Sequence, residues 1–307
     1  MELSKKVKIA LDETRILILG AQILLGFQFR GVFSDGYEQL PTHARYLDGV
    51  ALGLMVCVVG LLITPGPYHR IVEGGEDSGN FHRLVTVIAD LALLPFALAL
   101  GLDLFITAGR VFGEVAGAAA GIAATAVAAA FWYGFPRLRK RYTGEQERVV
   151  SSSQTRERSS TPLYAKMEQM LTEARVVLPG AQALFGFQLA IVLTQSQLPS
   201  ASKITHAASL FLVALAVVLL MAPAAYHRIV YAGEDSQDMH RVGSVLVTAA
   251  TIPLALGLVG DVYVVITKIV GSRTGGLIAG SLALVLLIGL WHAYPLVAAY
   301  FRNRTAR

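Results

Sequence analysis

The side chains best suited to chemistry are histidines, arginines and carboxylates that the chain carries twice. The first copy has His69, Arg70, Glu76, Asp77, His82 and Arg83, and the second has His227, Arg228, Glu234, Asp235, His240 and Arg241. Two imidazoles and two carboxylates in one segment could coordinate a divalent metal ion. The arginines could instead bind an anion or a lipid head group. A third interpretation is structural, with Glu13–Arg70 or Asp77–Arg83 salt bridges that fix the ends of helices.

An acid and an arginine precede each copy, at the start of an apolar run. Glu13 and Arg15 come first, and Glu173 and Arg175 recur 160 residues later. We expect them on the same side of the membrane as the histidines, so all these residues form one candidate polar site per repeat. The spacing of the histidines matches no metal-binding motif, and we therefore expect neither a metal nor another cofactor.

Four glutamines lie inside apolar runs: Gln22, Gln28, Gln182 and Gln188. Six residues at about 100° each separate the two amides of one run by roughly 120°, so they do not share one narrow stripe. A buried amide usually hydrogen-bonds to another helix. The alternative is that these amides line a polar pathway.

Asp90 is the one carboxylate well inside an apolar run, and an intramembrane acid is a functional candidate. Its counterpart in the second copy is Thr248, so a role of Asp90 in proton coupling would make the copies unequal. The alternative is a protonated or hydrogen-bonded Asp90 buried between helices. Asp103 and Asp261 each precede a cation by seven residues, which predicts an ion pair or a helix-end anchor at the outer end of a span.

Eight long apolar runs must position these residues. They are residues 16–32, 47–64, 84–106, 115–133, 176–193, 207–221, 242–266 and 276–290. Charged residues make up only 15% of the chain, compared with about 25% in soluble domains. Continuous runs of this length predict membrane-spanning helices. The predicted fold is therefore all-α, a polytopic integral membrane protein with eight transmembrane helices.

Four spans in each copy return the chain to the same side, which predicts two parallel four-helix repeats. Twenty of the 26 lysine and arginine residues fall on the side of the two termini. This asymmetry predicts cytoplasmic N- and C-termini in the cell (inner) membrane. The net charge of +5 thus reflects topology, and we expect the lipid bilayer and its anionic head groups, not nucleic acid, as partners. Whether the chain forms a homo-oligomer stays open.

The predicted repeats cover residues 1–141 and 163–307. Residues 142–162, rich in Ser, Thr, Arg and Glu, predict a disordered cytoplasmic linker. Small residues near the fourth span of each repeat predict close helix packing: Gly113, Gly117 and Gly121, then Gly271, Gly275, Gly276 and Gly280. Trp132 and Trp291 at the end of that span are typical of a membrane-interface belt.

Each copy carries Glu-x-Arg, then Gly-Ala-Gln and Gly-Phe-Gln, then a His-Arg pair after span two. These motifs occupy residues 13–28 and 69–70, and again residues 173–188 and 227–228. This pattern resembles an uncharacterised family of small bacterial four-helix membrane proteins. The resemblance implies a tandem fusion of that unit and brings no activity with it.

Two classes of function stay open. The first is a small transporter or channel-like protein, whose polar pathway would reach Gln22, Gln182 and Asp90. The second is a non-transporting membrane scaffold or a lipid- or anion-binding module, which predicts dry bundles with polar groups paired at their ends. An enzyme is the least favoured class, because no nucleophile–base pair appears and no catalytic residue is predicted.

Overall fold

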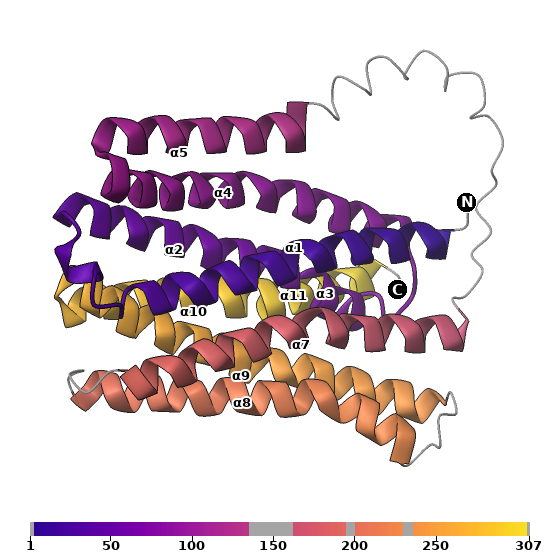
Figure 1. The fold of residues 1–307 in the computed structure, drawn as a ribbon. Helices are drawn as coiled ribbons and strands as arrows, with labels where there is room; N and C mark the ends of the chain where they lie inside the picture. The colour runs from indigo at the N-terminus through magenta and orange to yellow at the C-terminus, as the bar shows by residue number, and fades with distance from the viewer. Residues whose placement is uncertain (1–2, 135–161, 195–199, 230–235, 306–307) are drawn as a thin grey trace.

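The computed structural model describes residues 3–134, 162–194, 200–229 and 236–305, and all regular elements within them are helical (Figure 1). The first half contains α1 (Leu3–Gly31), η1 (Tyr37–Gln39), α2 (Thr42–Ile63), α3 (Pro65–Ile71), α4 (Gly79–Phe112), α5 (Glu114–Ala129) and the π-helical η2 (Ala130–Gly134). The second contains α7 (Leu163–Thr194), α8 (Ser200–Ile229), α9 (Gln237–Val270), α10 (Arg273–Ile288), the π-helical η4 (Gly289–Ala293) and α11 (Tyr294–Thr305). The all-α prediction is confirmed. Of the predicted linker, only Pro162 lies within the described residues.

Equivalent helices of the two halves run in the same direction (Figure 1). The chain passes back and forth through α1, α2, α4 and α5, and then repeats this course through α7, α8, α9 and α10. Both chain ends lie at the end of the bundle where α1 begins, which we call the N-terminal end. The other is the opposite end.

Within the described residues, six helical segments are long and apolar enough to cross a membrane, as expected of a membrane protein. They are Thr42–Ile71, Gly79–Phe112, Leu163–Ile191, Ala201–Ala224, Gln237–Val270 and Arg273–Arg302. Two of the eight predicted spans match shorter apolar helices, Leu17–Gly31 and Glu114–Ala129. Large apolar side chains also face outward, as Phe112 does at 77% exposure. Such a surface is unfavourable in water and favourable in lipid.

Helices α4 and α9, the third spans of the two halves, begin and end at the same kinds of residue. Ser78 accepts a hydrogen bond from the backbone N–H of Phe81 and caps α4, and Ser236 caps α9 through Met239 in the same way. Gly113 and Gly271 follow these helices with φ of 93° and 69°. Only glycine adopts such angles readily, so these two glycines end helices and are not packing residues as predicted.

The remaining small residues of the fourth spans do pack closely, but within each half. A Cβ added to Gly117 would lie 2.6 Å from the carbonyl oxygen of Phe105 on α4. In the second half, a Cβ on Gly276 would lie 2.7 Å from the carbonyl oxygen of Tyr263 on α9. The glycines therefore let α5 and α10 approach the backbone of the preceding long helix.

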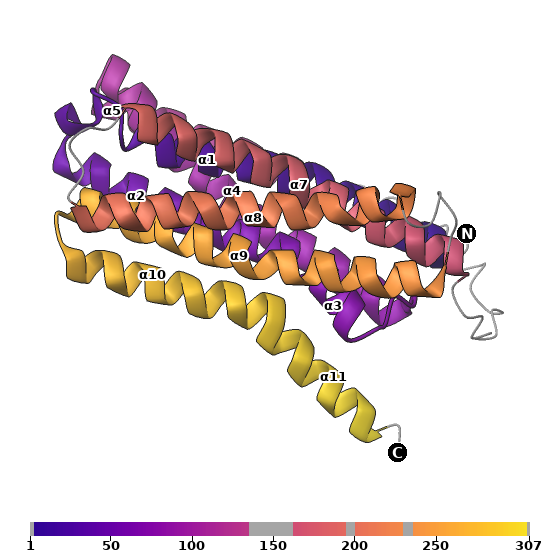
Figure 2. The same ribbon diagram turned by 90° about the horizontal axis from the view of Figure 1, so that it is seen from below.

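The two halves share one hydrophobic core, and α1 packs along α7 (Figure 2). Gly180 of α7 accommodates the side chain of Gln22, whose Cβ would lie 2.6 Å from a Cβ added there. Gly26 of α1 accommodates the ring of Phe187 in the same manner. Part of the repeated Gly-Ala-Gln and Gly-Phe-Gln motifs therefore lies in the contact between the two repeats.

A π-helical turn occurs at the equivalent place in both halves, and it holds a tryptophan each time. Trp291 of η4 is completely buried, and its Nε1 donates to the carbonyl oxygen of Gly60 on α2 at 2.8 Å. The prediction of an interfacial belt is wrong for Trp291, because it joins the two repeats. Trp132 of η2 lies beside Phe96 within its own half, with 5.6 Å between ring centroids. Beyond η4, α11 bends away from the bundle (Figure 2).

Candidate functional site

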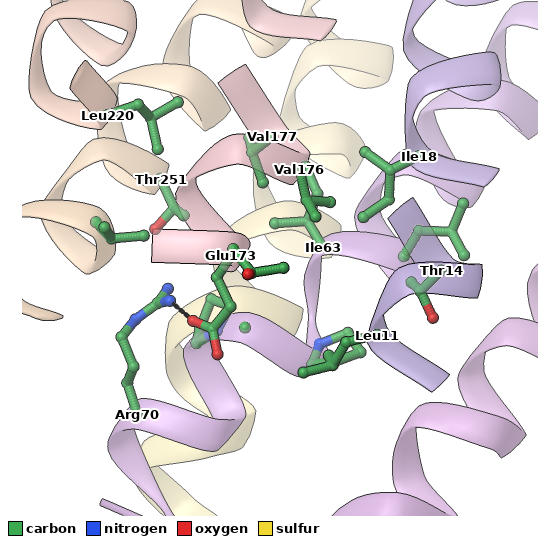
Figure 3. Close-up of a pocket in the computed structure, with 16 residues that line it drawn as sticks. Leu11, Thr14, Ile18, Ile63, Arg70, Glu173, Val176, Val177, Leu220 and Thr251 are labelled. Atoms are coloured by element: carbon green, nitrogen blue, oxygen red, sulfur yellow. Dashed lines mark hydrogen bonds and ion pairs between the residues drawn. The ribbon is translucent and has the colours of Figure 1, made fainter. Parts of the chain in front are cut away.

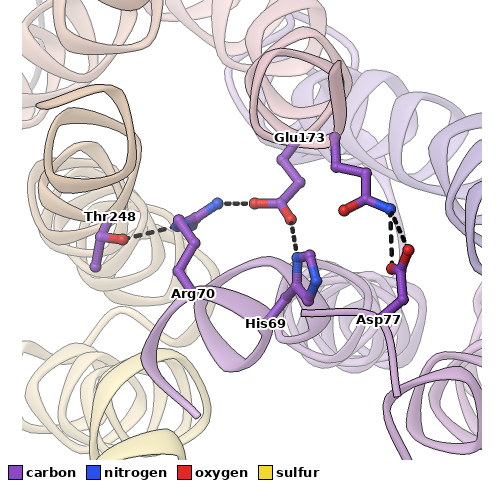
Figure 4. Close-up of polar contacts among 6 residues, drawn as sticks. His69, Arg70, Asp77, Glu173 and Thr248 are labelled. Carbon is purple, nitrogen blue, oxygen red and sulfur yellow. Dashed lines mark hydrogen bonds and ion pairs between the residues drawn. The ribbon is translucent and has the colours of Figure 1, made fainter. Parts of the chain in front are cut away.

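The strongest polar contacts between the repeats lie toward the N-terminal end, where α3 meets α7 and α9. Arg70 donates to Oε2 of Glu173, and its Nε donates to Oγ1 of Thr248 at 2.7 Å (Figure 4). His69 Nδ1 lies 3.0 Å from Oε1 of Glu173. We call these four residues, His69, Arg70, Glu173 and Thr248, the cross-repeat cluster.

Helix α3 sets the geometry of this cluster. Pro65 occupies the first helical turn, where its missing N–H costs nothing. The following turn places His69 and Arg70 next to each other facing α7, whereas the sequence placed them in a loop. The imidazole of His69 stacks on Phe81 of α4, with centroids 4.3 Å apart and planes 16° apart. Both residues are therefore held by packing as well as by Glu173.

The cluster is almost completely removed from solvent. The side chains of Arg70 and Glu173 are each 6% exposed, and that of His69 is 2% exposed. Burying such charges is favourable only when partners compensate the lost hydration. The carboxylate of Glu173 accepts from Arg70, and it also accepts from His69 in the tautomer that carries a proton on Nδ1. His69 Nε2 is buried without a hydrogen-bond partner among the described residues.

A second layer of contacts extends the cluster toward the N-terminal end. Lys166 forms an ion pair with Glu76. Nε2 of Gln169 donates to both carboxylate oxygens of Asp77 at 2.9 and 3.1 Å (Figure 4). The acids come from the segment between α3 and α4, and their partners come from α7. The predicted Glu13–Arg70 pair is wrong, because Arg70 pairs with Glu173 of the other repeat, and Asp77 binds Gln169 there.

A pocket adjoins the Arg70–Glu173 pair (Figure 3). Its lining is mostly apolar and comes from both repeats, with Ile18, Ile63, Val176, Val177 and Val247 among its walls. The pocket has a volume of about 40 Å³, counted as the space that the centres of water molecules could occupy. One water needs roughly 10–15 Å³ by this measure, so the space is small.

Apart from His240, whose imidazole is close enough to interact with the charges of Glu173 and His69, the remaining described residues of the predicted polar site do not converge on the cluster. Arg15, Arg83, Arg175 and Arg241 are exposed, and His82 is half-buried. His240 faces the first repeat, because a Cβ added to Gly75 would lie 3.1 Å from its Nε2. The side chains of Glu13, His227 and Arg228, and the positions of Glu234 and Asp235, lie outside the described part of the chain.

Two of the four glutamines bind a carboxylate on another helix, in the same way in each repeat. Gln28 Nε2 donates to Asp103 on α4 at 3.0 and 3.2 Å, and Gln188 Nε2 donates to Asp261 on α9 at 2.5 Å. The predicted outer ion pair of Asp103 with Arg110 is therefore wrong. Arg110 instead donates to the carbonyl oxygen of Gln39 at 3.1 Å.

None of the remaining intramembrane candidates lines the pocket beside Arg70. Gln22 is buried against Gly180, and Gln182 is exposed on α7. Asp90 is exposed on α4, and its backbone carbonyl accepts a hydrogen bond from Tyr133. The interpretation of Asp90 as buried between helices is therefore wrong.

Electrostatic effects outside the spans concentrate on Tyr37 in η1, near the opposite end. Burial, and then the nearby Asp48 carboxylate, raise the pKa of Tyr37 far above its ordinary value. Its hydroxyl donates to Asp48 Oδ2 at 3.1 Å. Within the residues that the structure describes, no group of three or more His, Cys, Asp and Glu side chains is placed to hold a metal ion.

Sequence reasoning missed Thr248, Lys166, Gln169 and Trp291 as partners. Their roles depend on which faces of the helices pack against each other, and one amino-acid sequence does not reveal this packing. One signal was present for Gln28 and Asp103, because both recur in the second copy at nearly the same separation. The Gln–Asp pair, which both copies contain, could therefore have been predicted in place of the ion pair between Asp103 and Arg110.

One family model matches the chain twice, over residues 2–136 and 156–295. Its description is "Family of unknown function (DUF6328)". Neither a curated protein nor a solved structure matches the chain.

Proposed function

Because the chain belongs to this family of unknown function, as a tandem pair of its units, we propose a function from the geometry alone: a non-transporting membrane scaffold. The carrying observation is that the buried side chains of Arg70, Glu173, Gln28 and Gln188 each hydrogen-bond to a residue on another helix. The Arg70–Glu173 pair lies toward the N-terminal end of the bundle, and the two Gln–Asp pairs lie toward the opposite end. Paired ends of this kind suit a rigid module and leave no connected polar pathway through the described pockets.

The proposed topology has eight spans in two parallel four-helix bundles, residues 1–141 and 163–307, joined by the linker 142–162. The two shorter apolar helices support this count, because each packs along long helices of its own half. The excess of lysine and arginine beside the N-terminal end supports cytoplasmic termini in the inner membrane. The same proposal includes binding of anionic lipid head groups near these basic residues. It also includes assembly of the chain into a homo-oligomer.

Thiol accessibility tests the scaffold. Cys57 is the only cysteine, so a Cys57→Ala background permits single labels. We expect Gln22→Cys to resist a membrane-impermeant thiol reagent from both sides, because Gln22 is packed against Gly180. Arg241→Cys, at an exposed site at the start of α9, is the labelled control. Labelling of Gln22→Cys at the rate of Arg241→Cys would support the transport pathway and contradict the scaffold.

A second candidate function is lipid binding, and the pocket beside Arg70 favours it. Its apolar walls and charged rim suit the end of an acyl chain with a polar group nearby. Val247 of α9 is 2% exposed and lines the pocket, whereas Val245 is 63% exposed on the same helix. We expect Val247→Phe to reduce the phospholipid retained through purification, as measured by mass spectrometry, because the larger ring fills the pocket. Equal retention by Val247→Phe and the matched Val245→Phe would exclude the pocket as the lipid site.

A further inference from the structure

Helices α1 and α7 are equivalent in the two repeats, yet the contact between them is one-sided. Gln22 of α1 packs on Gly180 of α7. The ring of Phe187 of α7 packs on Gly26 of α1. A contact with two-fold symmetry would use the equivalent residues of both helices in the same way. These equivalents, 160 positions away, are Gln182, Gly20, Phe27 and Gly186, and we call them the outer set.

The outer set is left exposed. The ring of Phe27 lies 4.6 Å from that of Phe187, measured between centroids, and is still 58% exposed. Gly20, Gln182 and Gly186 are exposed as well. Among the described residues, no packing partner lies within 4 Å of a Cβ added to Gly186. Helices α1 and α7 lie on the side of the bundle away from α10 (Figure 2). Their outer surface thus carries a glutamine, a ring and the two kinds of glycine site that receive them.

Gln182 makes this surface unfavourable in lipid. It stands nine residues before Ile191, where the membrane-capable segment Leu163–Ile191 ends. At 1.5 Å per residue it lies about 14 Å from that end, near the middle of a hydrocarbon core of about 30 Å. Its amide has donors and an acceptor, and none of them is bonded to a described residue. Lipid chains offer no partner, and an amide at this depth usually hydrogen-bonds to another helix.

We propose that a second copy of the chain covers this surface, with α7 of each copy packed on α1 of the other. Gln182 then packs on Gly20 of the second copy, and Gly186 receives the ring of its Phe27. This contact repeats, residue for residue, the contact that α1 and α7 make within one chain. A two-fold axis along the membrane normal uses it twice and closes the pair. The inference rests on the homo-oligomer of the proposed function and names its partner and its interface.

Disulfide cross-linking between two differently tagged forms of the full-length chain tests the pairing. In a Cys57→Ala background, one form carries Gly20→Cys and the other carries Gln182→Cys. The two forms are co-expressed and oxidised in native membranes. We expect a disulfide-linked product that carries both tags. Val285→Cys replaces Gln182→Cys in the control, because Val285 is 72% exposed in the span formed by α10, on the other side of the bundle (Figure 2).

Two further variants measure the strength of the dimer by light scattering of the purified protein and by energy transfer in vesicles. Gly186→Ile fills the open site on α7 and should convert the dimer to a monomer. Its melting temperature as a monomer should not fall, because the added side chain meets no described neighbour. Gln182→Leu removes one amide from each of the two contacts and should raise the dissociation constant of the dimer roughly tenfold.

Four results would overturn the proposal. They are a wild-type protein that stays monomeric at every lipid-to-protein ratio, a folded Gly186→Ile variant that stays dimeric, and equal cross-linking of Gly20→Cys to Gln182→Cys and to Val285→Cys. The fourth is cross-linking of Gln182→Cys to itself but not to Gly20→Cys, since α7 would then pack on α7. The scaffold is judged separately by labelling of Gln22→Cys, which reports packing inside one chain.

Discussion

Replacing Glu173 with alanine is expected to destabilise the protein by about 3–5 kcal/mol, the usual cost of removing one partner of a buried ion pair. Glu173 is the common acceptor for Arg70 and His69. Without it, the guanidinium of Arg70 stays buried, with the hydroxyl of Thr248 as its remaining hydrogen-bond partner among the described residues. Reversible unfolding in mixed micelles of dodecyl maltoside and SDS measures the change in free energy of unfolding.

Arg175→Ala is the matched control for this prediction, since Arg175 is an exposed charged residue on the same helix. Surface substitutions of this kind usually change stability by within about 0.5 kcal/mol. Equal losses in the two variants would mean that burial of the pair contributes nothing specific, and that the cross-repeat cluster does not hold the repeats together.

Trp291→Ala is expected to cost a similar amount, about 3–5 kcal/mol, because it leaves a cavity in the shared core. Trp291 has no exposed surface and reaches from η4 to Gly60 of the other repeat. Trp291→Phe keeps most of the ring volume and removes the indole N–H. That variant should lose about 0.5–1.5 kcal/mol, the net contribution of a typical hydrogen bond. The same unfolding assay measures both.

The equivalent tryptophan of the first half provides the comparison. Trp132 is half-buried and contacts Phe96 of its own repeat, so Trp132→Ala should cost less than Trp291→Ala. A Trp132→Ala variant that is as unstable as Trp291→Ala would contradict the role of Trp291 as a joint between repeats.

The helices themselves were predictable from sequence, because each apolar run must satisfy its own backbone hydrogen bonds in lipid. The class of fold, the repeat and the close approach at Gly117 and Gly276 all follow from local composition. The length of α1 and the helical state of Tyr68–Arg70 do not. They depend on tertiary contacts beyond the apolar runs, such as the stacking of His69 on Phe81.

The partners across the repeats were not predictable, because they depend on the rotation and spacing of whole helices. The sequence offered Glu13 and Glu173 as equivalent acids, and the structure pairs Arg70 with the one in the other repeat. Asp90 shows the same difficulty. Its counterpart Thr248 binds Arg70, whereas Asp90 itself lies exposed on α4. Residues that are equivalent in sequence therefore occupy different surroundings. The two repeats share the course of their helices but differ in their side-chain contacts.

The central claim is that the repeated polar residues join the two repeats, and a double-mutant cycle between Arg70 and Glu173 tests it most directly. Arg70→Met, Glu173→Leu and the double variant are compared with the wild type by the same unfolding assay. We expect each single variant to be strongly destabilised and the double variant to recover much of the loss, since an apolar pair can replace a buried ion pair at little cost. The coupling energy should exceed about 0.5 kcal/mol. Additive losses in the double variant would contradict the claim.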